Sequence, residues 1–432
     1  MKISVIGAGY LGATHAICMA SLGHEVVVVD IDAQKISQLQ NGVVPFFEPR
    51  LTELLHEVQT SRKLFFSTEI ANISNCFIHF LCIGTPQLKD GLAADLSGLE
   101  HAFASVISVA PSGSIMVGKS TVPVGTAERL ARDIESAGKK LTLNWNPEFL
   151  REGFAVADTL APNRIVIGAA NPSDTWILAE FYKSVSPQAP QFITDFATAE
   201  LVKVAANAFL ATKISFINAM SEVADATGAD VTLLADAMGI DDRIGRKFLG
   251  AGIGFGGGCL PKDVRAFIAR ADELGLGDSL HFLREFDLIN QRARTRAVAV
   301  ALKELGDPHG KKIAILGAAF KPDSDDVRDS PALEIAETLA ALGAKVMIND
   351  PRALANAAEK IPELEYSESI EETLKDADLT MHLTEWADYR ALDPLTLRTL
   401  VKTPTLFDGR NVLDVKLWKN AGWKLLALGR SL

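Results

Sequence analysis

One short segment of the chain places a cysteine among residues that could give it chemistry. Residues 254–263 read GFGGGCLPKD, so that Cys259 follows four glycines in five positions and precedes Lys262 and Asp263. Glycines let a ligand approach the backbone closely, and a neighbouring cation lowers the pKa of a thiol, which favours the nucleophilic thiolate. The alternative is a small apolar residue after a flexible turn, the usual role of a cysteine outside a disulfide. The spacing alone leaves both interpretations open.

A second group of polar residues is spaced for one face of a helix. Lys203 and Asn207 are four residues apart in an unbroken helical pattern, with the apolar Leu201 and Phe209 beside them. An ammonium and an amide that point at one place can stabilise an oxyanion. Taken alone, a solvated lysine beside a hydrogen-bonded asparagine is the commoner interpretation.

Two glutamates occur in the segment NPEFLREG, residues 146–153. Glu148 and Glu152 are four residues apart, and Asn146-Pro147 before them indicates a turn. Paired carboxylates can act as acid and base, although glutamates at the beginning of a helix are more often without a catalytic role.

The N-terminal segment predicts a dinucleotide site. Gly7, Gly9 and Gly12 follow the β-branched run KISVI in GxGxxG spacing, and Asp30 closes the next apolar run. These glycines allow a tight turn, close approach of a pyrophosphate and close packing of helix on strand. A carboxylate at the position of Asp30 accepts hydrogen bonds from ribose hydroxyls and repels a 2′-phosphate, so the pattern favours NAD over NADP. Lys35 is near enough for a ribose or phosphate contact, although a surface lysine is the commoner interpretation.

Strands and helices alternate through the first part of the chain. Residues 2–30 predict a strand, a helix that ends near Gly23 and a second buried strand. Residues 77–86 and 114–123 are expected to be later parallel strands, and residues 164–170 the strand that closes the region. The alternation implies a doubly wound parallel sheet.

The middle of the chain predicts a long helix. Residues 198–227 contain no proline or glycine, which corresponds to a helix of about 45 Å. Asp195 or Thr198 can cap its beginning and Gly228 can end it. Further helical pattern continues to about residue 305. We expect this segment to join two α/β regions and to form a dimer surface.

The strand–helix rhythm returns at residues 311–350 and repeats the opening as far as Asp350. The second copy has GAAFKP where the first has GAGYLG, with Lys321 and Arg328 where glycines would face a phosphate. We therefore expect NAD in the first copy and a different phosphorylated ligand in the second. The predicted fold is α/β, with two Rossmann-like doubly wound sheets and three domains: residues 1–197, 198–305 and 306–432.

Length and composition narrow the class of protein. A chain of 432 residues is too long for one ordinary core. A net charge of −11 argues against general binding to nucleic acid or to an anionic membrane, and no apolar run approaches the ~20 residues of a bilayer span. The four cysteines show no CxxC pair or zinc spacing, so we predict no metal and no disulfide framework. A cytoplasmic protein is expected.

Nine segments together resemble the UDP-glucose/GDP-mannose dehydrogenase family, in the order of that family and over nearly the whole chain. They are GAGYLG, CIGTP, KSTVPVGT, NPEFLREG, AELVKVAANAFLATKISFINAM, DDRIGRKFL, GFGGGCLPKD, FKPDSDDVRDSP and FDGRNVLD. The resemblance implies an NAD-binding domain, a sugar-nucleotide-binding domain and a helical dimerisation segment between them. It also implies oxidation of a sugar C6 alcohol to a carboxylate with two NAD.

The resemblance further implies roles for individual residues. Cys259 matches a nucleophile that forms a thiohemiacetal and then a thioester, which allows two oxidations at one site. The other matched catalytic residues are Lys203, Asn207, Asp263, Thr121 and Glu148. The residues that match NAD contacts, the glycines of the first segment included, are Gly7, Gly9, Tyr10, Leu11, Gly12, Asp30, Lys35, Thr85, Thr121, Glu152 and Arg328. The residues that match the substrate site are Glu148, Phe149, Leu150, Arg151, Glu152, Lys203, Asn207, Arg243, Phe248, Leu249, Gly250, Ala251, Gly252, Gly256, Lys321 and Arg410, with Arg243 matching an arginine lent to the partner subunit.

The chain departs from the family pattern at three positions. Gly258 stands where many members have serine, Trp145 replaces a residue that is usually small, and Ala219 lies where a glutamate is common. None of them belongs to the catalytic set.

Several interpretations remain open at this point. The loop motifs favour UDP-glucose as substrate, with GDP-mannose as the nearest alternative. A one-step hydroxyacid dehydrogenase also uses a lysine and an asparagine on a helix, but it needs neither the thiol nor a second sheet. A non-catalytic NAD or sugar-nucleotide binder would keep both ligand sites without any need for Cys259.

Overall fold

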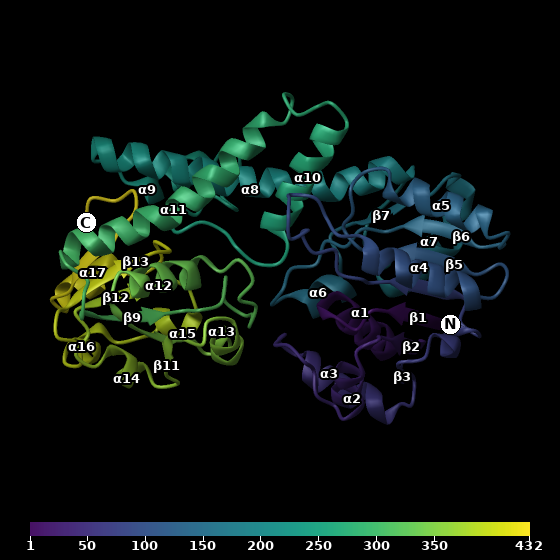
Figure 1. Ribbon diagram of the computed structural model, residues 1–432, viewed down its shortest axis with the longest axis horizontal. Coiled ribbons are helices and arrows are strands. Elements are labelled where there is room, and N and C mark those ends of the chain that lie inside the picture. Colours follow the sequence, from purple (N-terminus) through teal and green to yellow (C-terminus); the bar gives the residue numbers. More distant parts are fainter. The chain divides into compact units, whose positions relative to one another are not determined.

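The computed structural model describes the whole chain, Met1 to Leu432, as two compact units (Figure 1). The first unit comprises residues 1–206 and 265–275, and the second comprises residues 207–264 and 276–432. Each unit has one β-sheet between two layers of helices, so the prediction of two α/β sheets is confirmed. Helices α8 (Phe196–Thr227) and α10 (Leu260–Glu273) contribute residues to both units. The division into three domains stays a prediction.

The first sheet has eight strands in the order β3-β2-β1-β4-β5-β6-β7-β8. Strands β1 to β6 are parallel, whereas β7 is antiparallel to β6, and β8 is parallel to β7. The expectation that residues 164–170 close the sheet is wrong, because β8 lies beyond them at the edge. Its two apolar residues, Phe192 and Ile193, are exposed, so no buried run marked it in the sequence. The strands are β1 (Lys2–Ile6), β2 (Glu25–Val29), β3 (Leu64–Ser67), β4 (Ile78–Leu81), β5 (Ile115–Gly118), β6 (Thr142–Trp145), β7 (Ile165–Gly168) and β8 (Gln191–Thr194).

The apolar runs of these strands alternate between two hydrophobic clusters, one on each face of the sheet. In β1, Ile3 and Val5 pack with α1, α2, α3 and α7, whereas Ile6 packs with α4 and α5. Both faces are therefore covered, as a doubly wound sheet requires. The helices of this unit are α1 (Tyr10–Ser21), α2 (Ala33–Gln40), α3 (Leu51–Thr60), α4 (Ser97–Val109), α5 (Thr126–Ser136), α6 (Ala155–Leu160) and α7 (Trp176–Val185), with short 3₁₀ turns at Ile70–Ile73 and Pro172–Thr175.

A glycine on the neighbouring strand accommodates Trp145, the unusual residue before NPEFLREG. Gly118 of β5 is paired in register with Trp145 of β6, and the tryptophan is fully buried. A Cβ atom at Gly118 would lie 2.2 Å from the indole ring. The large side chain is therefore part of the core, and the loop after β6 begins from a fixed position.

Replacement of Gly118 by alanine is expected to destabilise the first unit by about 3 kcal/mol, because a buried rigid ring must move to admit the methyl group. The melting temperature measured by calorimetry should fall by roughly 6–12 °C. Gly98→Ala is the control, since a Cβ there would meet Ile83 at an ordinary 3.6 Å and lies in helix α4. Equal melting temperatures for the two variants would contradict this account of Trp145.

Helix α8 confirms the long helix expected from the sequence, and its 32 residues begin two positions earlier than predicted. Asp195 caps its beginning, since the carboxylate accepts hydrogen bonds from the backbone N–H and the hydroxyl of Thr198. Gly228, at φ +78°, ends it. The caps identified in the sequence therefore act where they were predicted.

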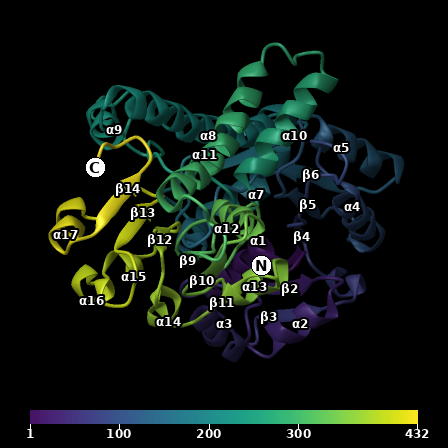
Figure 2. The same ribbon diagram turned by 60° about the vertical axis from the view of Figure 1, so that its left-hand side comes forward.

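The second sheet has six parallel strands in the order β11-β10-β9-β12-β13-β14 (Figure 2). Its strands are β9 (Lys312–Leu316), β10 (Lys345–Asn349), β11 (Glu365–Tyr366), β12 (Leu379–His382), β13 (Thr405–Asp408) and β14 (Lys424–Ala427). Helices α11 and α12 pack on one face, and α14, α16 and α17 on the other. The helices of this unit are α9 (Val231–Gly239), α11 (His281–Leu305), α12 (Pro331–Ala341), α13 (Leu354–Lys360), α14 (Ile370–Leu374), α15 (Ala387–Arg390), α16 (Pro394–Arg398) and α17 (Val415–Asn420).

The second sheet repeats the β1-α1-β2 arrangement but uses its acidic residue differently. Asp350 directly follows β10, as Asp30 follows β2. The carboxylate of Asp350 is 3% exposed and accepts hydrogen bonds from four backbone N–H groups and from the indole of Trp386. A carboxylate has about four acceptor positions, so Asp350 has none left for a ribose.

Candidate active site

The glycine segment after β1 has the geometry of a dinucleotide-binding turn. Gly7 adopts φ +93°, and a Cβ at Gly12 would lie 1.8 Å from the carbonyl oxygen of Gly7. A Cβ at Gly9, by contrast, would meet no protein atom within 4 Å. The backbone at Gly9 is thus open at the N-terminus of α1, where a helix favours the phosphate groups of a ligand.

Asp30 keeps acceptor capacity beside this turn. Its two carboxylate oxygens accept from the backbone N–H groups of Ala8 at 2.6 Å and Asp32 at 2.9 Å. Two acceptor positions remain for ribose hydroxyls. The Lys35 ammonium lies 3.7 Å from Asp30, so this lysine belongs to the same cluster. The residues present fit NAD.

Tyr10 and a carboxylate that sequence analysis missed join the turn to NPEFLREG. The Tyr10 hydroxyl donates to Glu48, which is buried and also accepts from the backbone N–H groups of Gly153 and Ala155, both at 2.7 Å. Burial and this carboxylate raise the pKa of Tyr10 above its ordinary value. Glu48 therefore fixes the segment that contains Glu152, close to the glycine turn.

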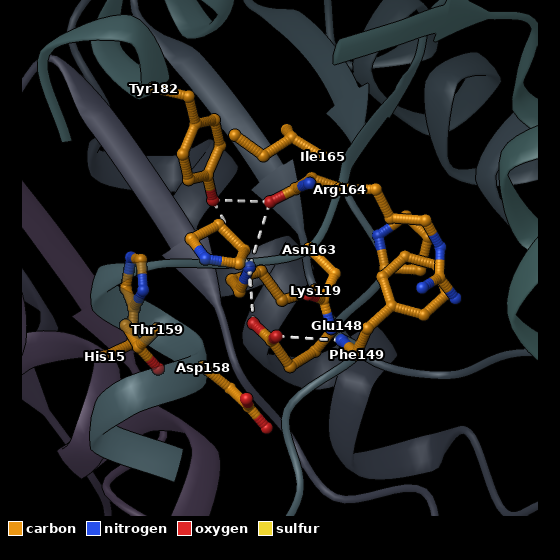
Figure 3. Close-up of a pocket in the computed structure, with 13 residues that line it drawn as sticks. His15, Lys119, Glu148, Phe149, Asp158, Thr159, Asn163, Arg164, Ile165 and Tyr182 are labelled. Carbon is orange, nitrogen blue, oxygen red and sulfur yellow. Dashed lines mark hydrogen bonds and ion pairs between the residues drawn. The ribbon is translucent and has the colours of Figure 1, made fainter. Parts of the chain in front are cut away.

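Polar residues gather where β4, β5 and β6 end. The Thr85 hydroxyl donates to the carbonyl oxygen of Thr121 at 2.8 Å. Lys119 directly follows β5, and its ammonium lies 2.9 Å from the Glu148 carboxylate (Figure 3). Glu148 lies in the loop between β6 and α6.

A pocket opens beside this ion pair, with His15, Lys119, Glu148, Phe149, Arg164 and Tyr182 among its lining residues (Figure 3). The guanidinium of Arg164 lies 3.8 Å from the centre of the Phe149 ring, and the Lys203 ammonium lies 5.4 Å from it. Phe149 and Lys203, two of the predicted substrate contacts, therefore lie next to each other.

The loop that carries Cys259 is fixed from several elements of the second unit. Asn218 of α8 accepts from the Gly252 N–H, and Asn290 of α11 exchanges hydrogen bonds with the backbone of Phe255. Phe248 adopts φ 65°, a left-handed conformation that is costly for an aromatic residue. Such strain is common where a loop is shaped for a ligand, and Phe248 to Gly252 are predicted substrate contacts.

Cys259 is the exposed member of four thiols, and it stands immediately before α10. Its carbonyl oxygen accepts from the Asp263 N–H at 3.0 Å, which places it at the N-terminus of the helix. The N-terminus of a helix is a position that favours negative charge. In contrast, burial raises the pKa of Cys18 and Cys82 to about 12 and that of Cys76 to about 11. Cys18 and Cys82 are buried core residues.

Two predicted catalytic residues of the second unit are joined directly. The Asn207 amide donates to the Asp263 carboxylate at 2.7 Å, and both side chains are buried. The Lys262 ammonium lies 2.6 Å from the other oxygen of Asp263. This arrangement holds the Asn207 side chain against Asp263, which lies one helical turn after Cys259.

Gly258, where many family members have serine, provides room for an arginine. A Cβ at Gly258 would lie 2.2 Å from the guanidinium carbon of Arg328. Arg328 also lies 2.6 Å from Asp326 and remains 63% exposed. This predicted NAD contact therefore lies against the residue before Cys259.

The guanidinium of Arg410, a predicted substrate contact, makes several hydrogen bonds within the protein. Its guanidinium donates to the carbonyl oxygens of Leu383, Gly254 and Phe320, and it lies 3.2 Å from Glu385. Arg410 thus holds the Cys259 loop onto the second sheet. Arg243, in contrast, is 89% exposed and pairs with Asp241.

The predicted catalytic residues fall on both units. Lys203, Thr121 and Glu148 belong to the first, whereas Cys259, Asn207 and Asp263 belong to the second. Sequence analysis missed Lys119 and Glu48. A lysine directly after the buried run SIMVG was a usable signal for Lys119, whereas Glu48 lies in the loop before α3 without any pattern.

No group of three or more histidine, cysteine, aspartate or glutamate side chains is placed to hold a metal ion. None of the helices has both the length and the apolar character needed to cross a membrane.

The sheet order around the glycine turn, together with Asp30, defines an NAD-binding dehydrogenase fold. Three domain models of the UDP-glucose/GDP-mannose dehydrogenase family match the chain: the NAD binding domain at residues 1–186, the central domain at 197–292 and the UDP binding domain at 314–415. The chain belongs to this family and is an NAD-dependent nucleotide-sugar dehydrogenase.

Individual relatives are similar to this chain over nearly their full length. The chain is 39% identical over 440 residues to UDP-glucose 6-dehydrogenase YwqF of Bacillus subtilis (strain 168), covering 100% of this chain and 98% of the relative. It is also 39% identical over 439 residues to UDP-glucose 6-dehydrogenase of Rhizobium meliloti (strain 1021), covering 100% of each. The structure of a UDP-glucose dehydrogenase from the archaeon Pyrobaculum islandicum superposes with a TM-score of 0.91 at 36% identity, over 100% of this chain and 98% of that one.

Proposed function

We propose that the protein oxidises the C6 alcohol of UDP-glucose to a carboxylate and reduces two NAD per sugar, through covalent intermediates on Cys259. The observation that carries this proposal is the exposed thiol at the N-terminus of α10, on a fixed glycine loop and one helical turn before Asp263, which is hydrogen-bonded to Asn207. The match of residues 314–415 to a UDP binding domain and the names of the relatives support UDP-glucose.

The glycine turn and Asp30 would hold NAD, which would supply the hydride acceptor for each oxidation. Lys203 and Asn207 stabilise the negative charge that develops on the C6 oxygen as the alcohol becomes an aldehyde. The alcohol proton passes to Lys203 or to a water held by Asp263. These residues therefore serve the first oxidation before the thiol takes part.

The second oxidation needs Cys259, because the planar carbon of an aldehyde is a poor hydride donor. The thiolate forms an S–C bond to C6, and the oxygen takes up a proton to give a thiohemiacetal. Loss of a second hydride and of the hydroxyl proton leaves a thioester. Water, positioned by Thr121 and assisted by Glu148, then breaks the C–S bond and releases the carboxylate and the thiol.

We also infer a cytoplasmic homodimer that shares Arg243 between subunits. The exposed apolar residues of the second unit support an interface: Phe209 and Val223 of α8, Leu233 of α9 and Ile240 are each more than half exposed. NAD and sugar nucleotides are intracellular metabolites, and all four cysteines are thiols.

The reaction stoichiometry tests the proposal. Purified protein with limiting UDP-glucose and excess NAD should form about two NADH per sugar, together with the uronate detected by mass spectrometry. A ratio of one would indicate a one-step dehydrogenase, and binding without NADH formation would indicate a non-catalytic binder. Either result would overturn the proposal.

GDP-mannose remains the alternative substrate, since the chemistry at C6 is the same. Parallel assays with UDP-glucose and GDP-mannose at equal concentrations separate the two. A kcat/KM at least tenfold higher for UDP-glucose is expected, and the reverse preference would assign the protein to the GDP-mannose branch.

A further inference from the structure

A buried lysine lies behind Glu148 and takes part in none of the steps above. Lys119 is 3% exposed, and its ammonium contacts three oxygens: Glu148 at 2.9 Å, Asn146 at 2.9 Å and the Tyr182 hydroxyl at 3.3 Å. The Tyr182 hydroxyl donates in turn to Asn146 at 2.5 Å. Each of the three N–H donors of the ammonium therefore has an oxygen partner. Two of these oxygens belong to the segment after β6, and the third belongs to α7.

The opposite side of the Glu148 carboxylate is held by its own loop. One oxygen accepts from the backbone N–H groups of Phe149 at 2.8 Å and Leu150 at 3.0 Å, and the other faces Lys119. Three of about four acceptor positions are thus used, and one remains on the oxygen that faces Lys119. A single water can donate to Glu148 there. The side chain is 20% exposed, so water can reach it.

We propose that Lys119 is a positioning residue that keeps the Glu148 carboxylate ionised and oriented for the water that hydrolyses the Cys259 thioester. This inference rests on the proposed function, because it assigns the hydrolytic role to Glu148. Thr121 lies two residues after Lys119, so both residues expected to handle this water are positioned from the end of β5.

The charges around Lys119 and Glu148 favour an ionised Glu148 carboxylate. Burial acts to raise the pKa of the Glu148 carboxyl, but the Lys119 ammonium and hydrogen bonds outweigh it, and the pKa lies below its ordinary value. Burial, with Lys119 adding to it, lowers the pKa of His15 to about 3, so this ring adds no charge. The other titratable or charged groups that face the pair or line its pocket are Cys18, Cys82, Asp158, Arg164 and Tyr182. Lys119 is the buried cation among them.

Hydrolysis of the thioester needs only water, the Glu148 carboxylate and the Cys259 thioester itself. The water oxygen bonds to the thioester carbon while one of its protons passes to Glu148. The C–S bond then breaks, and its electron pair leaves with the sulfur of Cys259. The low pKa of Glu148 returns the proton to solvent before the next turnover.

Lys119→Met tests the inference because it removes the charge and keeps the length of the side chain. The variant should still release two NADH per active site in a rapid burst, but thioester hydrolysis should slow by about 100-fold. Intact-mass measurement after acid quench should show a uronyl adduct on Cys259. The buried carboxylate without its cation protonates more readily, so the acid limb of the hydrolysis rate should move to higher pH. Lys119→Arg should restore the wild-type limb.

Lys183→Met is the matched control, since it removes an exposed lysine that pairs with Glu180 on α7, and it should behave as the wild type. Should Lys119→Met not fold, Lys119→Met combined with Glu148→Gln removes both charges and is compared with Glu148→Gln alone. Equal hydrolysis rates in these two variants support the inference, whereas a further slowing contradicts it. Wild-type hydrolysis and an unshifted pH profile in Lys119→Met would overturn it. A wild-type protein that forms no adduct and one NADH would instead refute the proposed function.

Discussion

Alanine in place of Cys259 should lower uronate formation by at least ~1,000-fold, because no other group can convert the aldehyde into a tetrahedral hydride donor. The other three thiols are buried and have raised pKa values, so they cannot substitute for it. The measurement is NADH formation together with mass spectrometry of the sugar product. Binding of UDP-glucose, followed by calorimetry, should change little, since the methyl group removes only the sulfur.

Cys76→Ala provides the control for this substitution. Cys76 is a thiol of the first unit that is 1% exposed, and its replacement should leave turnover within about twofold of the wild type. Full uronate formation by Cys259→Ala would remove the covalent mechanism, whereas equal losses in both variants would point to a general effect on folding.

The second large effect is expected at the glycine turn. Gly12→Ala places a Cβ 1.8 Å from the Gly7 carbonyl oxygen, so the turn must open and the backbone N–H groups lose their alignment. NAD affinity should fall by at least ~100-fold, about 2.8 kcal/mol, and the melting temperature of the free protein should fall by several degrees. Titration with NAD and calorimetry of the free protein measure the two effects.

Gly9→Ala separates an effect on NAD binding from an effect on the stability of the fold. A Cβ there meets no protein atom within 4 Å, and Gly9 has an ordinary φ of −70°, so the free protein should melt within about 1 °C of the wild type. If a pyrophosphate passes over Gly9, the same methyl group should weaken NAD binding by about tenfold or more. Unchanged NAD affinity in Gly9→Ala would contradict the location of the pyrophosphate.

The parts of this fold that were predictable are those determined locally. The GxGxxG turn and both ends of α8 depend on residues within a few positions of one another, and their residue types suit only a few conformations. Strand β8 could not be predicted, because it is four residues long and exposes Phe192 and Ile193. Its direction relative to β6 depends on a connection that no local pattern encodes.

The contacts within the candidate site were even harder to predict, because they join residues that are far apart in the sequence. Lys119 and Glu148 are 29 positions apart and meet only because β5 and β6 are adjacent parallel strands. Glu48 and Gly153 are still further apart, at 105 positions. For Arg410, the sequence indicated a cation but not that its donors are engaged by three backbone carbonyl groups. Residue types were therefore easier to predict than their partners.

The saturated carboxylate of Asp350 has a consequence for selectivity. NAD and a UDP-sugar share a ribose and a pyrophosphate, so two sheets of similar design in one molecule risk exchanging their ligands. Asp30 can still accept a dinucleotide ribose, whereas five internal donors occupy Asp350. The second sheet therefore lacks the free carboxylate that would accept the ribose of NAD, and we expect the coenzyme to bind at the first sheet rather than at the second.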